Sequence, residues 1–210
     1  MKLLEPLVDL VFPRWCCHCK KYGALLCSNC FSLLQFSQFI TKTVAHLNSI
    51  SSLVSLEQVS TSLIHELKYA SVKEVAILCA RLMYMYGSIP SVSIVASVPL
   101  HPIRQNERGF NQAEEIAQEL AKLHKLPYIR LLKRTRHTTN LASIVNKDVR
   151  STIIKDQFEL VAPLSNRASH CSVLIIDDVW TSGATLSEAA RVLKKAGIQS
   201  VHGLTFAHGN

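Results

Sequence analysis

Two adjacent carboxylates precede a turn of small residues in the segment VLIIDDVWTSGAT, residues 173–185. Four large apolar residues predict a buried strand, and Asp177 and Asp178 are expected to emerge at its carboxyl end. The following helix is predicted to begin in the TSGAT run, formed by Thr181, Ser182, Gly183, Ala184 and Thr185. Amides at a helix N-terminus and short hydroxyl side chains favour a bound phosphate, and carboxylates accept hydrogen bonds from ribose hydroxyls. The segment therefore predicts a site for a sugar phosphate.

Three other interpretations of this segment are open. In a turn without a ligand, an aspartate would cap the loop and a threonine would cap the helix. Paired acids also line the pockets of phospho-receiver domains, but there the pair comes early in the domain, and here it comes late. A nucleotide P-loop is disfavoured because no lysine precedes the serine or threonine of the turn.

Four cysteines form two C-x-x-C pairs that are separated by seven residues: Cys16, Cys19, Cys27 and Cys30. Each pair presents two thiolates from one tight turn, and four thiolates complete the tetrahedral set that zinc accepts. Four unrelated buried cysteines would not be expected to repeat this spacing. A site with four protein ligands is closed, so the predicted zinc is structural. Cys17 and His18 are alternative ligands within the first pair, although the spacing favours Cys16 and Cys19.

The composition predicts a folded chain with an anionic partner. Of the 210 residues, 48% are hydrophobic and 18% are charged, which excludes general disorder. The net charge of +8 favours nucleic acid, acidic lipid or a phosphorylated small molecule. Cysteines without an export signal indicate a reducing, cytoplasmic location. No apolar run is long enough to cross a bilayer, so any contact with the inner membrane is expected to be peripheral.

Apolar periodicity and turn residues indicate strands that alternate with helices. Strands are expected at 92–99, 128–132, 157–160, 172–176 and 200–207. One or two helices are expected within 62–86, and one helix each at 113–125 and 186–197. Residues 101–112 are predicted to be a loop, and residues 31–60 a weakly defined connection or short helices.

This alternation predicts an α/β fold with a mostly parallel sheet flanked by helices. Functional groups are then expected at the carboxyl ends of the strands. We predict a small N-terminal zinc-ribbon module at 1–35, a connecting segment at 36–60 and the α/β domain at 61–210.

The acidic strand end followed by TSGAT resembles the ribose-phosphate motif of type I phosphoribosyltransferases. Three further features occur in the order seen in the ComF family of competence-associated proteins: the four cysteines, ELKY at 66–69 and VPLHPIRQNERGFNQAEEIA from residue 98. The RGFNQ run at 108–112, together with the cysteines, is specific to that family. The similarity covers nearly the whole chain.

The resemblance implies a type I phosphoribosyltransferase-like domain that binds phosphoribosyl pyrophosphate (PRPP), with magnesium on the pyrophosphate. Asp177 and Asp178 would contact the ribose hydroxyls, and residues 181–185 would hold the 5′-phosphate. Arg104 follows a predicted strand end and would meet the pyrophosphate or another polyanion. A solvated basic loop is the alternative for this segment.

Several basic residues are candidates for contacts with DNA: Arg108, Arg130, Lys133, Arg134, Arg136 and Arg150. The KRTRHTTN segment at 133–140 is either a loop that covers PRPP, a track for a nucleic-acid backbone or a solvated surface. No aromatic residue is interleaved with its charges, so salt-sensitive contacts with the DNA backbone are expected.

Two functions follow from the resemblance. The first is a competence factor for natural transformation that binds and handles incoming single-stranded DNA on the cytoplasmic side, with a PRPP-binding pocket and with a DNA-uptake helicase and recombination proteins as partners. The alternative is an active phosphoribosyltransferase, which would transfer ribose 5-phosphate from PRPP to a base or another nitrogen nucleophile. No general base or other catalytic residue is identifiable. A zinc protein with a purely structural role is the third possibility.

Overall fold

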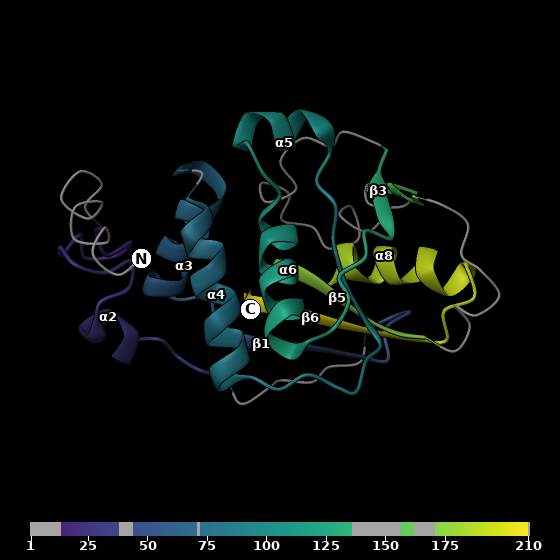
Figure 1. Cartoon of the computed structure of the whole chain (residues 1–210), viewed down its shortest axis with the longest axis horizontal. Helices are drawn as coiled ribbons and strands as arrows, with labels where there is room; N and C mark the ends of the chain where they lie inside the picture. The colour runs from purple at the N-terminus through teal and green to yellow at the C-terminus, as the bar shows by residue number, and fades with distance from the viewer. Residues whose placement is uncertain (1–13, 38–43, 71, 136–155, 162–170, 210) are drawn as a thin grey trace.

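A parallel sheet of four strands forms the centre of the fold (Figure 1). The computed structural model describes residues 14–37, 44–70, 72–135, 156–161 and 171–209. The strand order is β1-β6-β5-β2, and every neighbouring pair is parallel. The strands are β1 (Ser49–Ser55), β2 (Ile94–Ser97), β5 (Ser172–Trp180) and β6 (Ser200–His208). The mostly parallel sheet that the sequence predicts is therefore confirmed.

Strand β5 is buried on both faces of the sheet. Leu174 and Ile176 belong to one hydrophobic cluster, whereas Val173 and Ile175 belong to the other. A continuous apolar run is what a strand covered on both sides requires. The strand does not end at Ile176 as expected but continues through the two aspartates to Trp180, because pairing with β6 extends to His208.

Helices cover both faces of the sheet. On one face, α4 (Lys73–Tyr86) and α6 (Gln112–His124) lie side by side (Figure 1). Five alanines of these helices are buried, and their small side chains allow the helices to pack closely: Ala76, Ala80, Ala113, Ala117 and Ala121. On the opposite face, α8 (Ala184–Lys195) contributes buried leucines and alanines to the second cluster. The predicted helices at 113–125 and 186–197 are thus confirmed.

The expectation of a connection or short helices at 31–60 is wrong for its central part. Strand β1 pairs with β6 along its length, for example Ile50 with Gly203. It is rich in serine, which is not typical of a buried strand, so its place in the sheet depends on pairing with residues about 150 positions later in the chain. Two short helices flank it, α2 (Ser28–Ser32) and α3 (Gln58–His65). The predicted domain boundaries at 35 and 60 stay a prediction.

Residues 101–112 are not the loop that the sequence predicts, because they contain α5 (Pro102–Arg108). Pro102 occupies the first turn, where its missing N–H is not needed, and the ring of His101 accepts a hydrogen bond from the Ile103 N–H at 3.3 Å. Gly109 follows with a φ of 76°. None of the α5 residues is buried, so the helix has no apolar face for periodicity to detect.

A second, two-stranded antiparallel sheet is formed by β3 (Leu132–Arg134) and β4 (Phe158–Leu160). The segments 128–132 and 157–160 do reach extended structure, but they lie outside the main sheet apart from a single parallel bridge between Tyr128 and Val95. Leu132 and Phe158 pack with α8 in the second cluster. Within the described residues, no helix is long and apolar enough to span a membrane.

Candidate functional site

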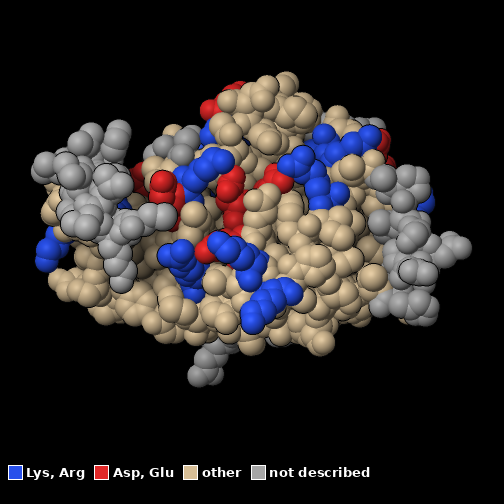
Figure 2. Space-filling view, viewed as in Figure 1, with Lys and Arg blue, Asp and Glu red and all other residues tan. Residues whose placement is uncertain are grey.

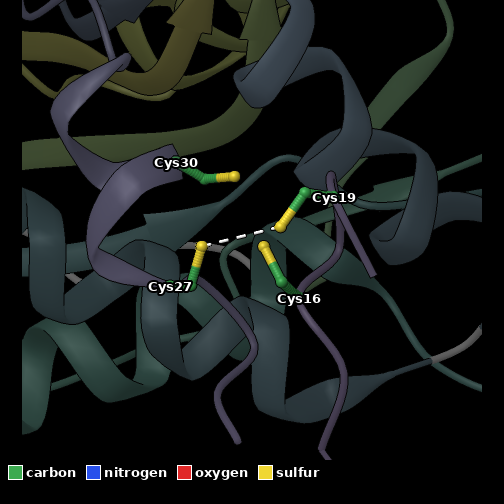
Figure 3. A group of neighbouring side chains, drawn as sticks. All are labelled: Cys16, Cys19, Cys27 and Cys30. Atoms are coloured by element: carbon green, nitrogen blue, oxygen red, sulfur yellow. Dashed lines mark hydrogen bonds between the residues drawn. The ribbon is translucent and has the colours of Figure 1, made fainter. Parts of the chain in front are cut away.

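The four cysteine sulfur atoms converge on one point near the N-terminal end of the described chain (Figure 3). All of them lie within 4.8 Å of one another, and the Sγ atoms of Cys19 and Cys27 are 3.6 Å apart. Sulfur atoms about 2.3 Å from a tetrahedral zinc ion would be about 3.8 Å apart. The sulfur set therefore has the geometry and chemistry for zinc, and the cluster could bind this metal.

The surroundings of Cys17 and His18, the two alternative ligands, differ from those of the four cysteines of the cluster. Burial opposes ionisation of Cys16, but the backbone N–H groups of Cys27, Cys19 and His18 outweigh it and lower the pKa of that thiol to about 6. Burial raises the pKa of Cys17 to about 11. The ring of His18 is hydrogen-bonded to Ser62 Oγ at 3.0 Å. Cys17 and His18 thus contact the rest of the protein and lie outside the group of four sulfur atoms.

The cysteine turn, residues 16–30, contacts the α/β fold at several points, one of which is the π-helical turn η1 (Glu66–Ala70) between α3 and α4. Lys20 Nζ lies 2.8 Å from Glu66 Oε1 at the start of this turn. Cys16, Cys17 and Cys30 are buried in the same cluster as α4 and α6. The metal module and the sheet therefore share a hydrophobic core.

The opposite side of η1 contacts the acidic end of β5. Lys68 Nζ lies 3.2 Å from Asp178 Oδ2, and both side chains are largely buried. No role for Lys68 was predicted from the sequence, although the lysine belongs to the ELKY run that supported the family resemblance. A π-helical turn is a frequent mark of a functional site, but it is visible only in the backbone.

The two aspartates meet different surroundings. Asp178 is buried and faces Lys68, whereas Asp177 lines a pocket together with Trp180 and the TSGAT turn. Because successive side chains of a strand point to opposite faces, neighbouring carboxylates can reach separate elements. Burial, and next the charge of Asp178, raises the pKa of Asp177 to about 8. The Asp177 carboxyl therefore holds its proton more tightly than an ordinary aspartate does.

Three arginines add positive charge around this pair of acids. The negative charge of Asp178 acts on Arg108, and that of Asp177 acts on Arg134. The positive charge of Arg104 acts on both of these arginines. Burial is the main cause that lowers the pKa of Arg108 and of Arg134. Arg134 also donates a hydrogen bond to Gln157 Oε1 at 2.6 Å. Arg104, predicted to meet a polyanion, is thus placed near two arginines that flank the acids.

The TSGAT turn forms the opposite wall of the pocket, which is lined by Asp177, Val179, Trp180 and residues 181–186. Gly183 is the N-cap of α8 and has a φ of 76°. A Cβ atom there would lie 3.0 Å from Trp180 Nε1 and 3.2 Å from a methyl group of Val44, so both the backbone and the space favour glycine. Ser182 Oγ accepts from the Ala184 N–H at 3.4 Å.

The pocket has polar groups that suit a sugar phosphate. The first amides of α8 have no acceptor within the helix and attract an anion. Thr205 pairs with Asp177 across the sheet, and its fully buried hydroxyl has no hydrogen-bond partner among the described residues. The hydroxyl groups of a ribose would donate hydrogen bonds to the Asp177 carboxylate. The residues of the pocket therefore fit the PRPP that the motif implies.

The remaining DNA candidates are not gathered into one basic strip. Arg130 Nη2 lies 2.5 Å from Glu114 Oε1, and Lys133 Nζ lies 3.2 Å from Glu159 Oε2. Figure 2 shows acidic and basic groups side by side over α4 and α6. Arg136 and Arg150 lie outside the described residues. The charges of the aspartates act on Arg108 and Arg134. In the described part of the chain the candidates therefore divide between positions near these acids and surface positions paired with glutamate.

A sequence profile described as the phosphoribosyl transferase domain matches residues 106–210, which is half of the chain. The chain therefore belongs to the phosphoribosyl transferase domain family, and the type I phosphoribosyltransferase fold predicted from the sequence is confirmed. A solved glutamine PRPP amidotransferase from B. subtilis covers 64% of this chain and 26% of its own length, with 17% identity and a TM-score of 0.39. Because a TM-score of 0.39 carries no argument, the fold is assigned from the sequence profile and from the parallel sheet.

The curated relatives refine the family. Competence protein F of Haemophilus influenzae is 34% identical over 108 residues, which are 51% of this chain and 46% of that protein. The DNA utilization protein YhgH of Escherichia coli is 31% identical over 147 residues, which are 66% of this chain and 63% of that protein. The predicted relationship with the ComF family is confirmed. The chain spans about half to just under two thirds of the length of these relatives.

Metal analysis tests the cysteine cluster. We expect the purified chain to contain about one zinc ion and Cys27→Ser to lose it, because a structural site needs all four ligands. Cys171→Ser is the matched control, since Cys171 is also partly exposed but lies outside the cluster. Elemental analysis gives the stoichiometry, and a chelator should lower the melting temperature of the wild type. Equal zinc in both variants would contradict the site.

Gly183→Ala tests the shape of the TSGAT turn. At a φ of 76° an alanine costs about 1–2 kcal/mol, and here its Cβ also crowds Trp180. Gly109→Ala is the control, because Gly109 has the same φ of 76° and an added Cβ there would meet nothing within 4 Å. Denaturant unfolding should show the larger loss of stability for Gly183→Ala. Equal losses would mean that contact with Trp180 does not require the glycine.

Asp177→Asn should stabilise the ligand-free chain increasingly as the pH rises. The pKa of Asp177 is about 8 in the folded chain against 3.8 as its ordinary value. Unfolding therefore releases a proton between these values, and wild-type stability falls as the pH rises from about 4 to about 8. Melting temperatures at pH 5 and pH 8 give the comparison, with Asp156→Asn as an exposed control. A variant that is less stable than the wild type at pH 8 would disprove this expectation.

Proposed function

We propose that the chain binds PRPP with magnesium in the pocket between Asp177 and the TSGAT turn, and that it handles single-stranded DNA during natural transformation. The observation that carries the proposal is the pocket itself, which Asp177 and the start of α8 line together, with the charge of Arg134 acting on Asp177. This arrangement offers separate partners for the hydroxyls, the 5′-phosphate and the pyrophosphate of one ligand.

The roles of the residues follow from their surroundings. The amides and hydroxyls of the TSGAT turn hold the 5′-phosphate, and the Asp177 carboxylate accepts hydrogen bonds from ribose hydroxyls. Lys68 neutralises Asp178, which limits the repulsion between the acids and an anionic ligand. Arg104, Arg108 and Arg134 attract the pyrophosphate. Magnesium, when bound with the ligand, would neutralise further pyrophosphate charge.

The role in DNA handling is supported by the relatives and by the charge of the chain. Both relatives carry names that refer to competence or DNA utilization. A net charge of +8 favours a polyanion. An uptake helicase and recombination proteins are the partners that this role implies, on the cytoplasmic side of the inner membrane.

A phosphoribosyltransferase is the second candidate, and the arginines beside the pocket favour it. In this reaction the bond between ribose and a pyrophosphate oxygen breaks, and a bond between ribose and the nitrogen nucleophile forms. Cations near the departing pyrophosphate would stabilise the negative charge that develops on it. Release of pyrophosphate that requires a base or another nitrogen acceptor would establish this activity.

Calorimetric titration of PRPP with magnesium tests the ligand. The double variant Asp177→Asn, Asp178→Asn should bind on the order of tenfold to 100-fold more weakly, because hydrogen bonds to charged acceptors are lost. Asp156→Asn is the matched control, since Asp156 is exposed and pairs with Arg191 near β4. Wild-type affinity in the double variant would contradict the proposed site.

Fluorescence anisotropy of a labelled single strand tests the second half of the proposal. Binding should weaken as salt increases, with a slope of log affinity against log salt of about −0.7 for each phosphate contacted. A wild-type chain that does not bind single-stranded DNA at low salt would contradict DNA handling while leaving PRPP binding to the calorimetric result.

A further inference from the structure

Tyr69 presents an aromatic ring to solvent next to the acidic end of β5. Its side chain is 63% exposed, the largest fraction among the large apolar side chains of the described residues. The neighbouring Leu67 is fully buried, and Lys68 pairs with Asp178. The exposed ring is therefore one residue away from a group that contacts the acids of the candidate site.

Two side chains from different elements flank this ring. The ring of His65, at the end of α3, has its centroid 4.8 Å from that of Tyr69, at an interplanar angle of 41°. The guanidinium carbon of Arg108, at the end of α5, lies 5.9 Å from the centroid of Tyr69. A cation over an aromatic face is attracted to the ring. These contacts orient the phenol ring without burying it.

The backbone that carries the ring is held at two points. Glu66 pairs with Lys20 of the cysteine turn at 2.8 Å, and Lys68 pairs with Asp178 at 3.2 Å. Both ion pairs belong to η1, so the position of Tyr69 is set before any ligand arrives. A ring placed in advance loses little conformational entropy on binding.

The chemistry of this surface selects its occupant. An exposed ring offers stacking to a flat aromatic group, and the guanidinium of Arg108 beside it favours an occupant that carries negative charge. A nucleobase on a phosphodiester backbone has both properties, and an unpaired strand leaves the base faces accessible. The basic segment at 133–140 carries its charge without an interleaved Phe, Tyr or Trp.

We infer that Tyr69 is a stacking platform for a base of single-stranded DNA near Asp178 at the acidic end of β5, with Arg108 beside the base. The inference rests on the proposed handling of DNA and adds the place where a base is held. Such an arrangement would bring a bound strand next to Asp178, because Lys68 pairs with this carboxylate and Arg108 is influenced by its charge.

Binding of a labelled oligonucleotide of about 16 nucleotides to the full, zinc-containing chain tests the platform. Tyr69→Ala should weaken binding roughly 5- to 150-fold, which corresponds to the loss of one stacked base. The salt dependence should stay unchanged because no cation is removed, and Tyr69→Phe should bind like the wild type. Tyr84→Ala is the matched control, since Tyr84 is 44% exposed and also lies against a histidine ring, that of His124.

A strand of the same length without bases separates stacking from a structural effect. The wild type should bind the strand without bases more weakly than normal DNA. The factor should equal the one by which Tyr69→Ala weakens binding of normal DNA. The variant Tyr69→Ala should bind both strands with the same affinity. An equal loss with both strands would mean that the variant disturbs the backbone contacts, and it would overturn the platform. Unchanged binding of normal DNA by Tyr69→Ala would do the same.

Two further results identify which hypothesis fails. If the wild type binds DNA and Tyr69→Ala binds equally well, the platform is wrong and DNA handling stands. If the wild type binds no DNA, both are wrong. A free purine base serves as a competitor: saturable binding that requires Tyr69, without any effect of this residue on DNA, would overturn the DNA assignment in favour of a site for a free base.

Discussion

The placement of two consecutive carboxylates at the end of β5, Asp178 buried and Asp177 partly buried, is the constraint on which the arrangement of the site depends. Removing a charged group from water is costly unless another group compensates it. The strand separates the two acids, so each one meets its own partners: Asp178 meets Lys68, and Asp177 opens toward the TSGAT turn. Burial and the charge of Asp178 raise the pKa of Asp177, so the charged form of this carboxyl is less well compensated than that of an ordinary aspartate. A binding site that costs stability in this way is typical of function.

The elements that compensate the acids come from separate parts of the chain. Lys68 belongs to η1, Arg108 to α5 and Arg134 to β3. None of these elements has a strong apolar pattern of its own, and α5 has no buried residue at all. The first two converge because the parallel sheet places the carboxyl ends of its strands at one edge, where η1 follows β1 and α3, and α5 follows β2.

The cysteine module contributes to the same arrangement. A segment of about 25 residues is too small to bury a core of its own, and here its cysteines pack into the cluster beneath α4 and α6. Lys20 then reaches Glu66, two residues before the lysine that pairs with Asp178. The ligands of the expected metal and the acids of the pocket are thus connected by one turn of π-helix. Through this contact the N-terminal module helps to hold the turn that carries Lys68 in place on the α/β fold.

Local patterns in the sequence determined much of the fold and the chemistry of the site. The apolar run before Asp177 predicted a buried strand, the repeated C-x-x-C spacing predicted the sulfur cluster, and the TSGAT turn indicated an anion site. These features depend on neighbouring residues, whose spacing along the chain sets their spacing in space. The tertiary structure alone decided the rest: that serine-rich β1 joins β6, that the aspartates face different elements, and that Lys68 and Tyr69 stand beside them. Those relations join residues distant in sequence, and their energies come from pairing and burial that no local pattern records.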